Sequence, residues 1–430
     1  MKTIEIFKTN RFCFIGAVIF AFSIAFGQTP ATIGLVLWLV GSCFGFDRNL
    51  VQRNVLLLLP VLVFITYVVG YFITNGNDFS FLERKASLLV FPLIFFAHKY
   101  TKPERNVILK AFVCGVFLSS LICLTVSVYN STGYNSEGFN FTPNVLENRG
   151  FFESIMYGGN YFFGNHFSIF HQTVYFALYL CAAIAIMLFK PSLVSKRKNR
   201  FLFISFFLLI IFLVSNKSAF IAVMVIFLIW IGSLDLPIIK RVVLLSIMAL
   251  IAIATLFSNP RTKAMFQKVD EGQMVLNKDA RYGFPLRLLC WDAAISLIKQ
   301  NSVIGYGGTN AQSELNQVYQ KKEYKYALRD KLNAHNLFMQ VWIENGVLGL
   351  LASLLVFYGL FVQAFRHKKF EHNNLFIVLV TLLLISSLFE SIFSRFSGIL
   401  FFSFLSCFIF SARENKLESE PTPFNPKKDN

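Results

Sequence analysis

The sequence predicts an all-α polytopic membrane protein with about 12 transmembrane helices and one large external loop between the ninth and tenth spans. Two observations carry this prediction. Apolar runs recur along the chain, separated by short charged connections, which is typical of many membrane spans. Phe alone occurs 52 times in 430 residues, and only 15% of residues are charged. A soluble domain of this length needs far more polar surface, so the composition excludes a soluble protein.

Twelve segments are apolar enough and approach the length of about 20 residues that a membrane-spanning helix needs. They are residues 11–27, 31–46, 54–73, 79–98, 107–128, 169–189, 201–214, 218–233, 241–257, 336–363, 375–390 and 396–412. The weakly basic start, Lys2 to Arg11, resembles that of a signal peptide, but no small-residue cleavage site follows the first apolar run. We therefore expect an uncleaved first span. The even number of spans puts both termini on one side.

The distribution of basic residues orients these spans. With a cytoplasmic N-terminus, most Lys and Arg lie in inner connections, as the positive-inside rule requires. The short outer segments then carry only Arg84, Lys85, Arg149, Lys217 and Arg395. This predicts spans 1–9 within residues 1–257, a periplasmic loop at 258–334, spans 10–12 within 335–412, and a charged cytoplasmic tail at 413–430 that we expect to be disordered.

The long loop has the pattern of a folded unit. Pro285 begins a helical pattern in which Leu288, Leu289, Ile295 and Ile298 share one face. A Gly-rich turn at 305–308 follows. The loop is basic, and a basic loop beside the membrane suits an anionic ligand. A second outer segment, 129–168, is rich in Gly, Asn and Phe, and we expect it to lie on the membrane surface or dip into it.

Arg84 lies inside the apolar stretch 79–98, beside Lys85. A charge in a span costs about 2.5–3.5 kcal/mol on insertion scales, so such a residue is usually functional or paired. The alternative is that the span begins at Ala86 and that both side chains reach the outer interface by snorkelling. We favour a functional role.

Lys217 stands in the turn between two apolar runs of about 15 residues, each about 22 Å long as a helix and therefore short of the about 30 Å hydrocarbon core. Either the turn lies below the outer surface in a protein-lined cavity, or the bilayer thins and Lys217 is in water. Residue type leaves both open. For Arg395 and Glu390, the simplest expectation is an ion pair at the outer ends of the last two spans.

Three of the six His residues are predicted on the outer face: His166, His171 and His335. Their spacing lacks the close ligand pattern of a metal site, so we expect no metal. His335 lies where the long loop enters the membrane, and its imidazole is placed there to accept a proton. On residue type alone, a helix-start His that hydrogen-bonds the backbone is the more common case.

The residues around His335 change that judgement. Ala334-His335-Asn336-Leu337-Phe338-Met339-Gln340, followed by Glu344-Asn345-Gly346-Val347-Leu348-Gly349-Leu350, resembles the signature of the O-antigen ligase and O-antigen polymerase superfamily. Arg287, Trp291 and the turn Ile304-Gly305-Tyr306-Gly307 resemble the loop pattern that precedes it. Ser215-Asn216-Lys217-Ser218 is similar to a family turn in which Arg usually takes the place of Lys217. Weaker matches start at Arg84 and His171. The resemblance is specific from Arg287 to Leu351.

This resemblance implies a metal-independent inverting glycosyltransferase without a cofactor. Its donor would be a glycan on undecaprenyl diphosphate at the periplasmic face, and its acceptor a glycan or lipid A core hydroxyl. His335 would be the general base, and Arg287, Arg84 and Lys217 would hold the diphosphate. Supporting roles would fall to Asn336, Glu344, His171 and Arg395. Ligase and polymerase remain alternatives.

The main rival is a multi-span transporter or flippase for a lipid or polysaccharide. A transporter of 12 spans does not need a 77-residue basic loop ending in a His motif, and we find no internal repeat. The net charge of +17 is compatible with nucleic-acid binding, but the sequence has no nucleic-acid motif and its basic residues orient the spans. We therefore expect membrane lipids as the surroundings and no nucleic-acid partner.

Overall fold

The computed structural model describes residues 2–44, 54–135, 138–145, 150–157, 159–194, 196–258, 277–281, 283–371 and 373–412. The described chain is mostly helical, as predicted. The tail expected to be disordered, 413–430, lies outside the described residues, as does most of the first part of the long loop.

Each of the twelve predicted apolar segments coincides with one helix or with two consecutive helical elements. In chain order these are α1 (Lys2–Ser23) with η1 (Ile24–Phe26), α2 (Gln28–Phe44), η3 (Val55–Leu57) with α3 (Leu58–Ile73), α4 (Ser80–Lys85) with α5 (Ser87–Ala97), α6 (Lys102–Ser131), α8 (Thr173–Phe189), α9 (Arg197–Val214), α10 (Lys217–Ser233), α11 (Ile238–Ser258), α16 (Leu337–Glu371), α17 (Leu375–Phe389) and α18 (Phe396–Phe410). Short 3-10 turns, η5 (Pro191–Leu193) and η6 (Ile392–Ser394), connect some of them.

Three helices in the described part of the chain are long and apolar enough to cross a membrane: Val55–Ile73, Lys102–Ser131 and Leu337–Lys369. Seven shorter apolar helices, such as Thr173–Phe189 and Phe396–Phe410, accompany them. The total of 12 spans and the side on which each connection lies stay predictions.

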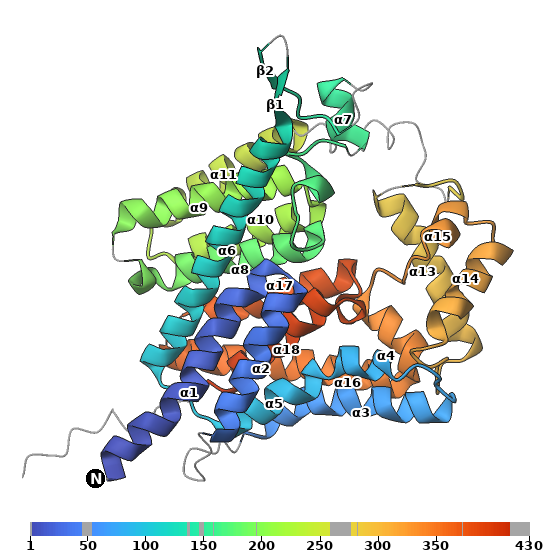
Figure 1. The fold of residues 1–430 in the computed structure, drawn as a ribbon, viewed down its shortest axis with the longest axis horizontal. Coiled ribbons are helices and arrows are strands. Elements are labelled where there is room, and N and C mark those ends of the chain that lie inside the picture. Colours follow the sequence, from blue (N-terminus) through green and yellow to red (C-terminus); the bar gives the residue numbers. More distant parts are fainter. Residues whose placement is uncertain are drawn as a thin grey trace, which may run out of the picture.

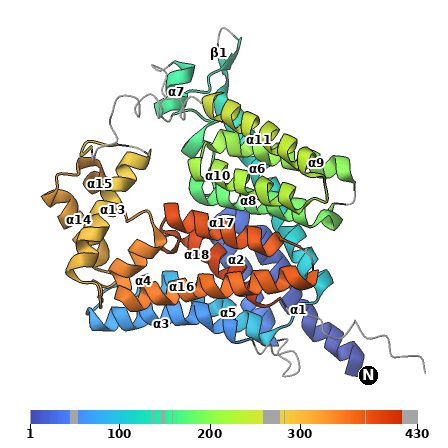
Figure 2. The ribbon, with the colours of Figure 1, turned by 180° about the vertical axis from the view of Figure 1, so that it is seen from behind.

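The helices gather into one body with a shared core (Figure 1). α1 packs on α2 and α6, α3 runs along α16, and α5 contacts α18. Figure 2 shows α8, α9, α10 and α11 grouped together on one side of this body. Phe20, Trp38, Phe91 and Phe404 form one aromatic cluster, with ring centroids 5.2–6.0 Å apart. The abundance of Phe thus fills gaps between helices.

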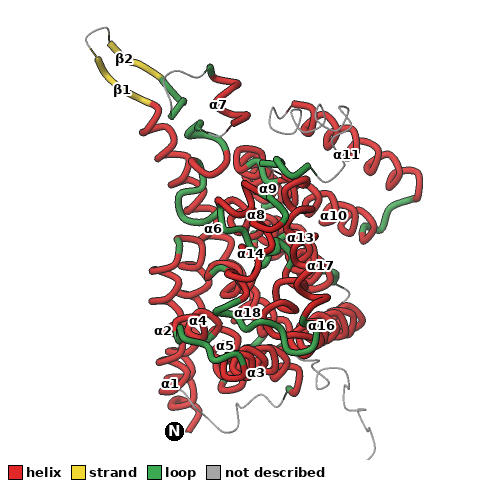
Figure 3. The backbone as a smooth tube through the Cα atoms, turned by 90° about the vertical axis from the view of Figure 1, so that its right-hand side faces the viewer, coloured by secondary structure: helices red, strands yellow, loops and turns green. Residues whose placement is uncertain are grey.

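The segment predicted to lie at the membrane surface contains a β-hairpin and short helices. β1 (Thr132–Asn135) pairs antiparallel with β2 (Gly138–Phe141), and α7 (Phe151–Tyr157) and η4 (Gly164–His166) follow. Figure 3 shows the hairpin projecting beyond the end of α6. Tyr134 and Phe139 are highly exposed there. Whether the segment lies on a membrane or dips into it stays a prediction.

The second part of the long loop, residues 277–334, is a small helical unit with its own core. It contains α13 (Gly283–Gln300), α14 (Ala311–Lys321) and α15 (Lys325–Arg329). α13 begins two residues before Pro285 and buries Leu289 and Ile298, which confirms the predicted helix. Ile295 is 42% exposed, so it does not belong to the buried face.

A polar cluster ties this unit together around Asp292. Lys322 forms an ion pair with the carboxylate, and the Tyr324 hydroxyl donates to it at 2.7 Å. Partial burial acts to raise the pKa of Asp292, but these donated hydrogen bonds outweigh burial and hold the pKa below its usual range. The unit is therefore cross-linked between α13 and the end of α14.

The predicted Gly-rich turn joins this unit to α16. α16 is broken at Gly346, whose φ is +62°, and the break frees carbonyl groups. Tyr306 donates its backbone N–H to Ile343 at 2.8 Å, and Gly307 donates to Glu344 at 2.9 Å. A Cβ on Gly346 would lie 1.9 Å from the carbonyl oxygen of Val303, so only glycine fits. The turn Ile304–Gly307 and the segment that starts at Glu344 therefore meet in space, and this contact fixes the loop unit on the helix that follows His335.

Candidate active site

His335 lies two residues before the start of α16 in a left-handed conformation, with φ of +46°. The Asn333 side chain accepts its backbone N–H at 2.9 Å. The ring Nδ1 is 3.1 and 3.2 Å from the two carboxylate oxygens of Glu390. A carboxylate only accepts, so Nδ1 carries the proton and the lone pair is on Nε2. Most of the ring is buried, and the carboxylate side chain is 10% exposed. This arrangement suits a base oriented by an acid.

Asn336 caps α16. Its side-chain oxygen accepts the backbone N–H of Met339 at 3.0 Å, and its amide donates to the carbonyl of Leu388 at 3.0 Å. Its own N–H donates to the Ser391 hydroxyl at 3.2 Å. Because Ser391 follows Glu390 in the chain, these bonds hold the His335 segment against the Glu390 segment. Asn336 therefore positions the helix start.

Glu344 and Gln340 form a buried chain of hydrogen bonds behind His335. The Gln340 side chain accepts the N–H of Ala334 at 2.9 Å and donates to Glu344 at 2.8 Å. Glu344 is 4% exposed. The nearby Lys85 is also buried, and its ammonium donates to the carbonyl of Phe393 and lies 4.7 Å from the Tyr67 ring centroid. Glu344 thus stabilises the loop that carries His335.

Arg287 comes from α13 and is half-buried. It lies close enough to Glu390 to stabilise the charge of that carboxylate. Within the described residues its guanidinium makes no hydrogen bond and no ion pair shorter than 4 Å. Five N–H donors beside the His335–Glu390 pair are thus free to bind a ligand.

Lys217 begins α10, after a turn in which Ser215 has a φ of +54° and Asn216 caps the helix through the N–H of Ala219 at 3.1 Å. Its Nζ would lie 3.4 Å from a Cβ built on Gly283, the first residue of α13. Arg287 is one turn further along α13. The fold therefore brings Lys217, Arg287, His335 and Glu390 into one region from four separate elements.

Arg84 and Arg395 lie differently from these residues. Arg84 contacts Asp78 at 3.5 Å and its side chain is 59% exposed, so its proposed role at the diphosphate stays a prediction. The expected pair of Arg395 with Glu390 is wrong, because Glu390 contacts His335 instead. Closeness in the sequence suggested the pair, because Arg395 is only five residues from Glu390. The actual partner, His335, comes from the start of another helix.

His171 and His166 lie apart from His335. The His171 Nε2 accepts the N–H of Gly27 at 3.2 Å, and Nδ1 is 2.9 Å from the Ser397 hydroxyl. His166 is exposed, with the Tyr161 ring 6.3 Å from its own. Across the described ranges, no three His, Cys, Asp or Glu residues form a group that could hold a metal ion.

Glu390 is the residue of the candidate site whose partner sequence reasoning missed. It is the only carboxylate between residues 373 and 412. A lone acid at the end of an apolar segment signals function or pairing. Sequence spacing favoured the nearby Arg395 as its partner, and only the fold shows that the partner is a His 55 residues earlier.

Comparison with known proteins supports the reading of this region. Residues 201–354 match the model of a family described as O-Antigen ligase. The matched range includes Lys217, Arg287, His335 and Glu344, whereas Glu390 and Arg395 lie beyond it. No curated protein matches the chain. The match supports the resemblance inferred from the sequence: residues 201–354 are similar to the O-antigen ligase family, the resemblance that the residues around His335 indicated.

Proposed function

We propose that this protein transfers a glycan from undecaprenyl diphosphate to a sugar hydroxyl at the periplasmic face of the bacterial cytoplasmic membrane. The contact between His335 and Glu390, with Arg287 beside it, is the observation that carries this proposal. A base and a phosphate-binding cation in one region are what this reaction needs. No transport pathway requires that combination, so the enzyme is favoured over a transporter or flippase.

In the proposed reaction, the acceptor hydroxyl gives its proton to Nε2 of His335 as its oxygen attacks the anomeric carbon. The bond between that carbon and the diphosphate oxygen breaks, and the electron pair leaves with the diphosphate. Attack opposite the leaving group inverts the anomeric centre. Glu390 stabilises the imidazolium that forms, and Arg287 and Lys217 stabilise the charge developing on the diphosphate. These residues supply the base and the cations without a metal.

The direct test uses purified protein and an undecaprenyl-diphosphate-linked oligosaccharide from the bacterium that encodes it. The acceptors are the same lipid-linked repeat or the lipid A core. A longer lipid-linked product identifies a polymerase, and a glycosylated core identifies a ligase. Transfer should continue in EDTA. Absence of transfer to either acceptor would reject the proposed function.

The proposed topology has both termini in the cytoplasm and the loop 258–334 in the periplasm. Cys290 is fully buried, so its thiol is a poor labelling site. We expect a variant with all seven Cys changed to Ala and Asn277 changed to Cys to react with a membrane-impermeant maleimide on intact spheroplasts. In the same background, Lys198→Cys should react only after the membrane is broken. The reverse pattern would refute this orientation.

Lys217→Arg is expected to keep near-normal transfer activity. The substitution retains the cation beside α13 and restores the residue that the family turn usually has. Steady-state rates on the lipid-linked donor measure this, with Lys217→Ala as the comparison that should lose activity. A strong loss in Lys217→Arg would show that the turn accepts only the smaller ammonium group.

A further inference from the structure

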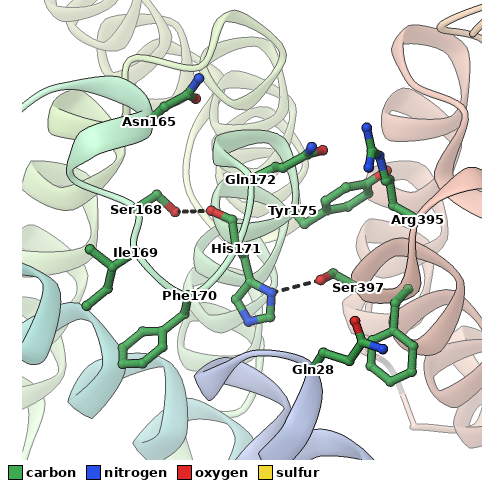
Figure 4. Close-up of a pocket in the computed structure, with 11 residues that line it drawn as sticks. Gln28, Asn165, Ser168, Ile169, Phe170, His171, Gln172, Tyr175, Arg395 and Ser397 are labelled. Atoms are coloured by element: carbon green, nitrogen blue, oxygen red, sulfur yellow. Dashed lines mark hydrogen bonds between the residues drawn. The ribbon is translucent and has the colours of Figure 1, made fainter. Parts of the chain in front are cut away.

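A cavity of about 470 Å³ opens among the starts of α2, α8 and α18, outside the residues assigned above to the base and the cations (Figure 4). Its volume is within the range of about 300–1,000 Å³ typical of small-molecule sites. Neither Arg287 nor Lys217 lines it. Its polar lining comes from Gln28, Asn165, Ser168, His171, Gln172, Tyr175, Arg395 and Ser397.

Hydrogen bonds around His171 fix the walls of this cavity. The ring accepts the N–H of Gly27 and thereby donates from Nδ1 to the Ser397 hydroxyl, which joins the α1–α2 turn to α18. The Ser168 hydroxyl donates to the carbonyl of His171 at 2.6 Å, and Tyr179 donates to the carbonyl of Ser397 at 2.8 Å. Figure 4 shows the His171 ring between these elements. These hydrogen bonds therefore hold three walls of the cavity together.

The lining has the chemistry of a sugar-binding site. Three side-chain amides and one guanidinium can bond hydroxyl groups, and Phe170, Tyr175 and Phe396 supply apolar surface for a pyranose face. The lining includes no carboxylate, so nothing in it would repel an acidic sugar. Arg395 forms no ion pair within the described residues and is exposed.

Tyr175 is a second, independent sign of a ligand. Its side chain is 1% exposed, and its hydroxyl has no hydrogen-bond partner among the described residues. A buried hydroxyl without a partner costs about 1–3 kcal/mol, so such a group usually binds water or a ligand or has a function. A sugar hydroxyl entering from the cavity would supply that partner.

Two residues that line the cavity, Tyr175 and Arg395, lie beside η6. A Cβ built on Gly398 would lie 2.6 Å from the Tyr175 ring and 2.3 Å from the carbonyl oxygen of Ile392, which belongs to η6. Because η6 follows Glu390 in the chain, the same short segment borders the cavity and carries the carboxylate that holds His335. The diphosphate cations Arg287 and Lys217 come from other elements, α13 and α10. We infer that this cavity binds the terminal sugar of the acceptor glycan, whose hydroxyl must reach His335. The inference rests on the proposed function.

The first test measures binding of oligosaccharides that lack both lipid and diphosphate. The two probes are the repeat unit released from its lipid carrier and the core oligosaccharide released from lipid A. One of them should bind the detergent-purified protein, and the one that does identifies the acceptor. Arg395→Ala, Gln172→Ala and Tyr175→Phe should each weaken this binding, by roughly ten-fold or more for Arg395→Ala because a charged donor is lost. Arg366→Ala, which removes an exposed Arg from α16, should not.

The second test titrates the same lipid-free acceptor against a saturating lipid-linked donor. Because the acceptor lacks a diphosphate, it cannot also act as donor. The cavity variants should raise the KM for the acceptor and leave the KM for the donor unchanged, whereas Arg287→Ala should act on the donor. A rise in the donor KM alone would place the donor glycan in the cavity and overturn the inference. Unchanged binding and unchanged acceptor KM in all three variants would also overturn it. Failure of the wild-type protein to transfer would reject the proposed function, and the binding test would still decide the cavity.

Discussion

Replacing His335 with Ala or Gln is expected to lower the rate of glycan transfer by at least about 10²–10⁴-fold, the range typical of a lost proton acceptor. The Nδ1–H of the ring is held by Glu390, which leaves Nε2 to take the proton of the acceptor hydroxyl. Donor binding should change little, because the cations hold the diphosphate. The measurement is kcat on the lipid-linked donor, with donor affinity determined separately.

The Glu390→Gln variant separates the two roles proposed for Glu390, which are to orient the His335 ring and to stabilise the imidazolium that forms on proton transfer. Gln still contacts the ring, but it carries no charge to stabilise the imidazolium. We expect a smaller loss than in His335→Ala and a changed pH profile of kcat, which a merely structural role would not produce. In the wild-type protein the rate should fall on acidification, because imidazolium cannot accept a proton. Near-normal turnover in a folded His335→Ala protein would show that another group takes the proton.

Arg287→Ala is expected to lose nearly all transfer activity, and Arg287→Lys to recover only a little. The guanidinium offers a bidentate fork to phosphate oxygens, whereas an ammonium group acts as a point charge. In the described structure this side chain has no hydrogen-bond or ion-pair partner that would make it a structural residue. Lys299→Ala is a matched control, because it removes an exposed cation from the same helix.

The readouts are kcat/KM for the donor and the thermal stability of each variant. Loss of activity with unchanged stability would place Arg287 at the diphosphate. Removal of Arg287 also withdraws a positive charge from Glu390, so the pH profile of Arg287→Ala should be recorded beside that of Glu390→Gln. Full activity in Arg287→Ala would remove the residue from the mechanism.

The helical segments followed from the sequence alone because each is encoded locally. Apolar runs of the right length, such as 169–189 and 396–412, can be predicted as helices without knowledge of the helices that pack against them. The helix around Pro285 and the turn at Gly305 could be predicted for the same reason. Proline at a helix start and glycine at positive φ each fit a backbone conformation that the local sequence sets. His335 and Arg287 emerged from the signature motif, which is also a local pattern.

Only the tertiary structure decides which charged side chains pair with one another. Glu390 pairs with His335, 55 residues earlier in the chain, and not with Arg395, which is only five residues away. Lys85 is buried, whereas its neighbour Arg84 is exposed. Both outcomes depend on which way a side chain points after helices have packed, and a rotation of about 100° per residue separates neighbours on one helix. The cavity beside His171 likewise exists only because the starts of three helices meet. A sequence specifies which charges are present in an apolar segment, whereas helix packing decides which of them face one another, because burial penalises every charge left without a partner.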